Sequence, residues 1–181
     1  MKNKERVLKL VKLKHGLPAV TPAFGAALAE AAAVCFEDQN HSGGVRLEVD
    51  GTFKAEYSVY WEKVTKQMRS CWNDLEVTTE QAAYGVAFLL ITDLTDYTII
   101  HRSRKGTGFD YWLGKEGDKD ELPFQNTARL EVSGIRKGNQ SLIKTRVKDK
   151  LNQVCRSDDL RLPAYIVIVE FSNPLSKVIK K

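Results

Sequence analysis

Two acidic residues, Asp110 and Glu131, each interrupt a segment whose alternating character is typical of a β-strand, residues 106–114 and residues 128–134. Ionised carboxylates are seldom deeply buried unless they are paired with a cation or bound to a metal. Two carboxylates that converge would suit Mg²⁺, or Mn²⁺ in its place, because such cations prefer oxygen ligands. The pattern therefore points to chemistry on a phosphate ester, where a bound ion neutralises developing charge and activates water.

Successive side chains of a strand point to opposite faces, so the spacing indicates which neighbours each acid has. Asp110 shares a face with Gly108 and Trp112, and Glu131 shares one with Arg129 and Ser133. A second interpretation stays open for each acid. Asp110 could be a strand-end carboxylate bonded to nearby backbone, and Glu131 could form a plain ion pair with Arg129 or with a partner strand.

Positive charge is concentrated in residues 129–161, which contain five more basic than acidic side chains, equal to the net charge of +5 for the whole chain. A basic stretch beside an acidic strand residue is what a surface that handles phosphodiesters needs. The alternative is a solvated helix face without a ligand. The basic residues are Arg129, Arg136, Lys137, Lys144, Arg146, Lys148, Lys150, Arg156 and Arg161.

The elements that must position these side chains are those of a single α/β domain, the default for 181 residues. Thr21 followed by Pro22 predicts a helix to about residue 38, and Thr78 with Gln81 predicts a capping box for a helix over 80–93. Residues 2–14 leave helix and strand undecided, and a charged loop is expected over 115–126. The remaining predictions are strands at 45–49, 53–60, 97–102 and 164–171, and helices at 62–72 and 138–155.

From residue 79 the predicted order is helix, strand, strand, strand, helix, strand. This order resembles the core of the PD-(D/E)XK nuclease superfamily, which has the restriction-endonuclease-like fold. The resemblance covers residues 79–172 and leaves residues 1–78 as an N-terminal elaboration of helices and a β-hairpin. It implies a mixed sheet and Mg²⁺-dependent endonuclease or exonuclease activity.

The resemblance also assigns residues. Asp110 takes the position of the family's Asp and Glu131 that of its Glu, whereas Ser133 falls where the family has Lys. An acidic residue on the first core helix is common in the family, which makes Glu80 a candidate third metal ligand. The missing ammonium group would have to come from Lys144, Lys137 or Lys105.

The expected partner is nucleic acid, DNA rather than RNA, held by the helix at 138–155 and the residues before it: Arg136, Lys137, Lys144, Arg146 and Lys148. A larger complex with a protein partner, in genome defence or repair, would suit so small a nuclease. Two other readings stay open. The chain could be a catalytically inactive member that binds nucleic acid or protein, or an interaction protein whose lysines only add solubility.

Other classes of protein fit less well. Three widely spaced cysteines argue against a disulfide framework or a zinc knuckle, and we expect a cytoplasmic protein with reduced thiols. The chain has no Gly-x-x-x-x-Gly-Lys-Ser/Thr loop and no Gly-x-Ser-x-Gly elbow. No apolar run approaches the roughly 20 residues of a membrane-spanning helix, so no membrane partner is expected.

Overall fold

The computed structural model describes residues 6–115 and 127–181, so most of the charged loop expected over 115–126 lies outside the described residues. The elements are β1 (Arg6–Lys9), the 3₁₀ helix η1 (Leu10–His15), α1 (Pro22–Asp38), β2 (Val45–Gly51), β3 (Ala55–Tyr60), α2 (Lys66–Cys71), α3 (Leu75–Leu94), β4 (Thr98–Arg102), β5 (Tyr111–Gly114), β6 (Ala128–Ile135), α4 (Gln140–Val154), the 3₁₀ helix η2 (Cys155–Leu160), β7 (Ala164–Glu170) and β8 (Leu175–Lys180).

Within the described residues the strands form one mixed sheet of eight, in the order β1-β3-β2-β8-β7-β6-β5-β4. Strands β4, β5 and β6 are antiparallel neighbours, and β6 pairs with β7 in parallel. The N-terminal strands extend the same sheet, because β2 pairs in parallel with β8. The element order from α3 to β7 is helix, strand, strand, strand, helix, strand, as the sequence pattern predicts.

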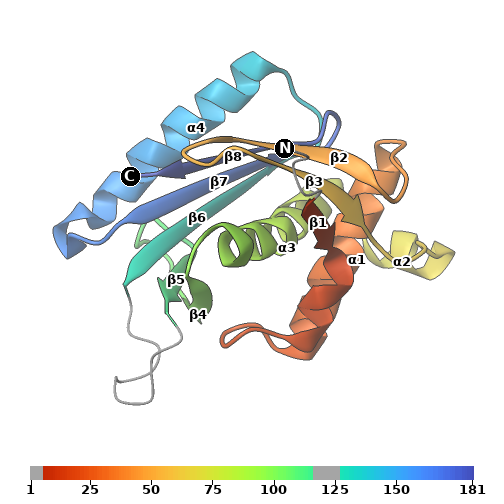
Figure 1. Ribbon diagram of the computed structural model, residues 1–181, viewed down its shortest axis with the longest axis horizontal. Coiled ribbons are helices and arrows are strands. Elements are labelled where there is room, and N and C mark those ends of the chain that lie inside the picture. The colour runs from red at the N-terminus through yellow and green to blue at the C-terminus, as the bar shows by residue number, and fades with distance from the viewer. Residues whose placement is uncertain (1–5, 116–126) are drawn as a thin grey trace, which may run out of the picture.

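Helices cover both faces of the sheet, with α1 and α3 on one side and α4 on the other (Figure 1). Strand β7 is buried along its whole length because its side chains alternate between the two layers. Tyr165, Val167 and Val169 join the core under α1 and α3, and Ala164, Ile166 and Ile168 pack beneath α4. The prediction of a central apolar strand at 164–171 is confirmed.

Helix α1 begins as predicted, with the Thr21 hydroxyl accepting a hydrogen bond from the Phe24 N–H at 3.2 Å. The predicted start of α3 is wrong. Asp74 caps that helix by accepting from the N–H groups of Glu76 and Val77, and the Thr78 hydroxyl donates back to the Asp74 carbonyl. Thr78 and Glu80 therefore lie inside the helix and not at its start.

The predicted strand over 106–114 is also shorter in the structure, because β5 begins only at Tyr111. Gly106 and Gly108 have φ angles of 97° and 85°, which L side chains rarely adopt, and they turn the chain just before Asp110. A Cβ on Gly108 would lie 2.5 Å from the Gln153 carbonyl oxygen. The turn is thus packed against the last turns of α4, which places Asp110 beside that helix.

Three further elements differ from the sequence-based predictions. The undecided N-terminal segment forms β1 and η1, and the helix predicted over 62–72 shortens to α2. Strand β8 follows β7 where the sequence pattern predicts no strand. None of the helices in the described part of the chain is long and apolar enough to cross a membrane.

Candidate active-site cleft

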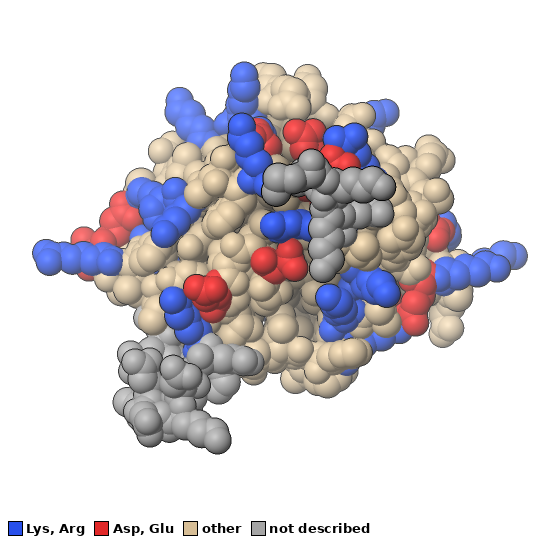
Figure 2. All heavy atoms as spheres, viewed as in Figure 1, with Lys and Arg blue, Asp and Glu red and all other residues tan. Residues whose placement is uncertain are grey.

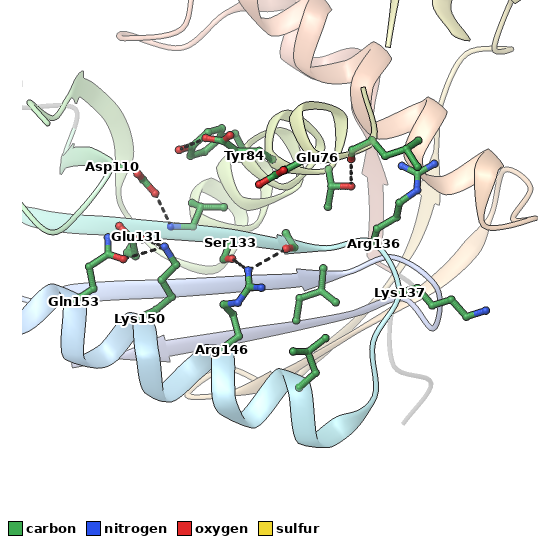
Figure 3. Close-up of a pocket in the computed structure, with 17 residues that line it drawn as sticks. Glu76, Tyr84, Asp110, Glu131, Ser133, Arg136, Lys137, Arg146, Lys150 and Gln153 are labelled. Atoms are coloured by element: carbon green, nitrogen blue, oxygen red, sulfur yellow. Dashed lines mark hydrogen bonds and ion pairs between the residues drawn. The ribbon is translucent and has the colours of Figure 1, made fainter. Parts of the chain in front are cut away.

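A cleft opens where β6 continues past the end of β5. Strand β5 pairs with β6 only as far as Tyr111 and Leu130, so the second half of β6 faces a gap between α3 and α4. The cavity there has a volume of about 630 Å³. Figure 3 shows its polar side chains, which include Asp110 from the turn before β5, Glu131 and Ser133 from β6, Tyr84 from α3, and Arg146 and Lys150 from α4.

Asp110 and Glu131 meet in this cleft. The Asp110 N–H donates to the Leu130 carbonyl at 2.9 Å, and its Oδ2 accepts from the Val132 N–H at 2.9 Å. One bond joins backbone to backbone and the other is made by the Asp110 side chain, and together they hold Asp110 against β6 on either side of Glu131. The backbone-bonded interpretation of Asp110 is therefore true for one carboxylate oxygen, and both acids line the same cavity.

Glu131 is buried, with 1% of its surface exposed. Its Oε1 accepts hydrogen bonds from Lys150 Nζ at 2.5 Å and from Gln153 Nε2 at 2.9 Å. Its Oε2 is buried without a hydrogen-bond partner among the described residues. Burial, followed by the negative charge of Asp110, raises the pKa of Glu131 to about 7, against the opposing effect of Lys150.

The alternative of an ion pair between Glu131 and Arg129 is wrong. Arg129 is itself 3% exposed, and it donates to Ser157 Oγ at 2.7 Å and to the Leu162 carbonyl at 2.6 Å. These bonds hold the segment that follows α4 against the start of β6. The ionic partner of Glu131 is Lys150, which the sequence pattern assigns to the outward, solvated face of its helix.

Lys150 belongs to the face of α4 that carries Leu142, Arg146 and Gln153, all of which line the cleft. This row runs beside the apolar residues Ile143 and Val154, which pack on the sheet. The sequence does indicate that Lys150 lies near the sheet. Polar residues that flank an apolar stripe at helical spacing lie at the edge of the packed face of a helix. The pattern does not reveal which of the two edges of this helix face lies beside Glu131.

Ser133 occupies the strand position two residues after Glu131, on the same face, and it is buried. Its hydroxyl oxygen accepts from Arg146 Nη1 at 2.6 Å, and Arg146 also reaches the Gly134 carbonyl at 3.4 Å. Where the family resemblance leads us to expect a lysine on the strand, this chain has a serine that holds an arginine from α4.

Glu80 and Tyr84 form the α3 wall of the cleft. The Tyr84 hydroxyl donates to Glu80 Oε1 at 3.4 Å, and burial together with the charges of Asp110 and Glu80 raises the pKa of Tyr84. Among the described residues no three His, Cys, Asp or Glu side chains are grouped closely enough to hold a metal ion. Glu80 thus shares the cleft with the two acids but does not complete a three-carboxylate cage with them.

The other predicted basic residues divide into two sets. Arg136 and Lys137 line the cleft, and Arg136 forms an ion pair with Asp38 of α1 at 2.6 Å, while Lys137 points away from the acids (Figure 3). Lys144, Lys148 and Lys105 are exposed and are not among the lining residues. Lys144 and Lys148 lie on turns of α4 between the cleft-facing positions, and Lys105 lies in the turn before β5.

The chain has many lysines, but its surface does not form a continuous basic binding face in the view of Figure 2. Figure 2 shows basic side chains over the region of α4, but acidic side chains lie between the basic ones across the rest of that face. Recognition of an anion would therefore depend on the cleft itself more than on a field from the whole face.

The donors present in the cleft fit a single hard cation. Two carboxylates face each other, and the buried Oε2 of Glu131 has no other partner among the described residues. The Val132 N–H faces Asp110, and because the N–H and C=O of one strand residue point to the same side, the Val132 carbonyl faces the cleft too. Mg²⁺ is typically held by one or two carboxylates and keeps several waters, so three oxygen donors suffice.

Comparison of the chain with protein-family models, with curated proteins and with solved structures found no match. The case for a function therefore depends on the chemistry of the cleft.

Proposed function

We propose that this protein hydrolyses phosphodiester bonds in nucleic acid, DNA in the first instance, with Mg²⁺ or Mn²⁺ held by Asp110 and Glu131. One observation carries the proposal. Two acids from positions 110 and 131 meet in a cleft, and one of them has a buried oxygen without a partner among the described residues. Such a site is costly for folding, and a bound cation would offset that cost.

The arrangement of elements supports the restriction-endonuclease-like interpretation of the core. Helix α3, strands β4 to β6, helix α4 and strand β7 follow one another in the order of that fold, and the sheet is mixed. The resemblance assigns an Asp to the second of these strands and a Glu to the third; Glu131 lies on β6, and Asp110 directly precedes β5.

Lys150 takes the role that the resemblance gives to a strand lysine. Its ammonium group is 2.5 Å from Glu131 Oε1, on the α4 side of the cleft. From there it would orient an attacking water and stabilise the negative charge that develops on the phosphate oxygens. Gln153, bonded to the same Oε1 at 2.9 Å, keeps the Glu131 side chain in position.

The cation, when bound, supplies charge neutralisation at the phosphate and lowers the pKa of a coordinated water. The protein contributes the carboxylates that hold it, and α3 and α4 enclose the reacting group. Tyr84, buried beside Asp110, limits the access of water from the α3 side.

The proposal is tested by metal binding and cleavage measured on the same variants. The intact protein should bind Mn²⁺ and cleave an oligonucleotide in the presence of Mg²⁺ or Mn²⁺. Asp110→Asn and Glu131→Gln should each lose the bound ion, and cleavage should fall by at least about 100-fold. Lys150→Met should keep the ion but lose cleavage to a similar extent.

Asp149→Asn provides the matched control, because Asp149 is an exposed acid on α4 that does not line the cleft. It should bind Mn²⁺ and cleave as the unchanged protein does. Mn²⁺ binding that survives in both Asp110→Asn and Glu131→Gln would contradict the proposed site.

A catalytically inactive protein that binds nucleic acid is the second candidate. The occupation of the strand lysine position by Ser133, bonded to Arg146, favours it. In that case oligonucleotide binding would weaken with salt but would not change when the divalent ion is removed by a chelator, and no variant would alter a cleavage rate.

A further inference from the structure

Side chains of helix α4 contact side chains of strand β6 at regular intervals along the cleft. Lys150 contacts Glu131, and Arg146, four residues earlier on the helix, contacts Ser133, two residues later on the strand. Four residues of helix rise by about 6 Å, and two residues of strand advance by about 6.6 Å. The helix and the strand therefore stay in register, and two basic groups follow one another along the cleft at this interval.

The charge of Arg146 is not neutralised within the described part of the chain. Lys150 forms an ion pair with Glu131, and Arg136 forms one with Asp38. Arg146 instead donates to two neutral oxygens, the Ser133 hydroxyl and the Gly134 carbonyl, and both bonds come from Nη1. A guanidinium group has five N–H donors, so the remaining ones are available to an anion.

Arg146 is held in place by its hydrogen bonds to β6. The 2.6 Å bond to the buried Ser133 hydroxyl fixes the guanidinium over β6 (Figure 3). An arginine already held in place loses little side-chain entropy when it binds a ligand, and its planar group suits the paired oxygens of a phosphate. A fixed, half-buried cation without a counter-charge is a site for an anion.

We infer that Arg146 binds the phosphate next to the one that is cleaved, an inference that rests on the proposed function. The strand then runs along β6, with the reacting phosphate at Lys150 and its neighbour at Arg146. The interval between the two basic groups is of the same order as the step between successive phosphates in a nucleic acid strand. Beyond Arg146, Leu75 and Leu142 are exposed side chains that line the same cleft, so a sugar or base has an apolar contact there.

The test uses a short oligonucleotide in which one phosphate at a time is replaced by an uncharged methylphosphonate. Affinity is measured by fluorescence anisotropy with Ca²⁺ in place of Mg²⁺, so that the strand is bound without being cut. The unchanged protein should lose about tenfold in affinity when a linkage directly beside the cleavage point is neutralised. Arg146→Ala should bind the unmodified strand about tenfold more weakly and lose nothing further at that linkage.

Two variants complete the experiment. Arg146→Gln keeps a donor for Ser133 without the charge, so it answers the same question if the alanine variant does not fold. Arg46→Ala removes an exposed arginine on β2 that forms an ion pair with Glu56, away from the cleft, and it should behave as the unchanged protein at every linkage.

The inference is overturned if neutralising the neighbouring linkage costs Arg146→Ala as much affinity as it costs the unchanged protein, or if Arg146→Ala binds the unmodified strand normally. Either result leaves the proposed function standing, provided that cleavage still depends on Asp110 and Glu131. If the unchanged protein binds no oligonucleotide under any of these conditions, the proposed function fails together with the inference.

Discussion

Two buried glutamates in this protein have opposite surroundings. Glu170 at the end of β7 is 1% exposed, and its carboxylate accepts from the N–H groups of Gly138, Ser172 and Asn173 at 2.7 to 3.2 Å. Glu131 is equally buried but has one oxygen without a partner among the described residues. Backbone donors of the fold thus satisfy the Glu170 carboxylate, whereas Glu131 faces Asp110 in the cleft, where we propose a bound cation.

This difference predicts opposite effects on stability. Because burial raises the pKa of Glu131 from 4.5 to about 7, the unfolded chain ionises this side chain first as pH rises, and folding stability is lost across that interval. In the absence of divalent ions, Glu131→Gln should therefore be more stable than the unchanged protein by about 1–2 kcal/mol at pH 8, with no gain at pH 4.5. Urea unfolding at the two pH values measures both.

Glu170→Gln is the control for burial alone, and at pH 8 it should lose about 1–3 kcal/mol because backbone donors lose their charged acceptor. A loss of stability at pH 8 in Glu131→Gln as large as that in Glu170→Gln would show that Glu131 is a structural residue.

At the scale of elements, the cleft depends on how closely β6 approaches α3. A Cβ on Gly134 would lie 2.5 Å from the Thr79 carbonyl oxygen, so the strand and the helix touch through backbone at this point. Gly134 follows Ser133 and lies three residues after Glu131. Its contact with Thr79 therefore fixes the position of α3, which forms the wall of the cleft opposite α4. Glycine is required here by space and not by φ, since its φ is not positive.

Gly134→Ala should push α3 away from β6. We expect a loss of about 1–3 kcal/mol in the free energy of unfolding, because backbone on both sides must shift. Gly43→Ala is the matched control, since its Cβ would meet only a Tyr60 ring atom at 3.7 Å, and it should change stability by less than about 0.5 kcal/mol. Equal stability of the two variants would contradict the close contact.

At the scale of the whole molecule, the N-terminal residues belong to the same core as the cleft. Strands β1, β3 and β2 continue the sheet, and α1 packs beside α3. Cys35 of α1 lies where these parts meet. Its sulfur is 4.0 Å from Thr79 Oγ1 of α3 and 3.8 Å from Arg136 Nη1 at the rim of the cleft.

Thiol labelling tests this junction. Burial raises the pKa of the Cys35 thiol to about 12, whereas Cys71 and Cys155 are exposed. Because the thiolate is the reactive form, a thiol reagent at pH 8 should label two thiols of the folded protein quickly and the third only after unfolding in urea. Three thiols that react at the same rate in the folded protein would show that α1 does not pack as the structure has it.

By itself, the sequence determined the elements whose signals are local. The Thr21–Pro22 start of α1, the apolar run of β7 and the strand around Glu131 follow from the preferences of nearby residues, and the structure agrees with each. The start of α3 and the length of β5 were predicted wrongly, because the Asp74 cap and the positive φ angles of Gly106 and Gly108 compete with equally plausible local patterns.

Only the tertiary structure decided which partner each basic side chain meets. Lys150 and Glu131, Arg146 and Ser133, and Arg136 and Asp38 are pairs whose members lie 19, 13 and 98 positions apart. The local sequence does not distinguish one lysine or arginine from another, and periodicity indicates only the helix face on which each lies. Their partners depend on the register of α4 against β6 and of α1 against the sheet, which is set by packing over the whole core.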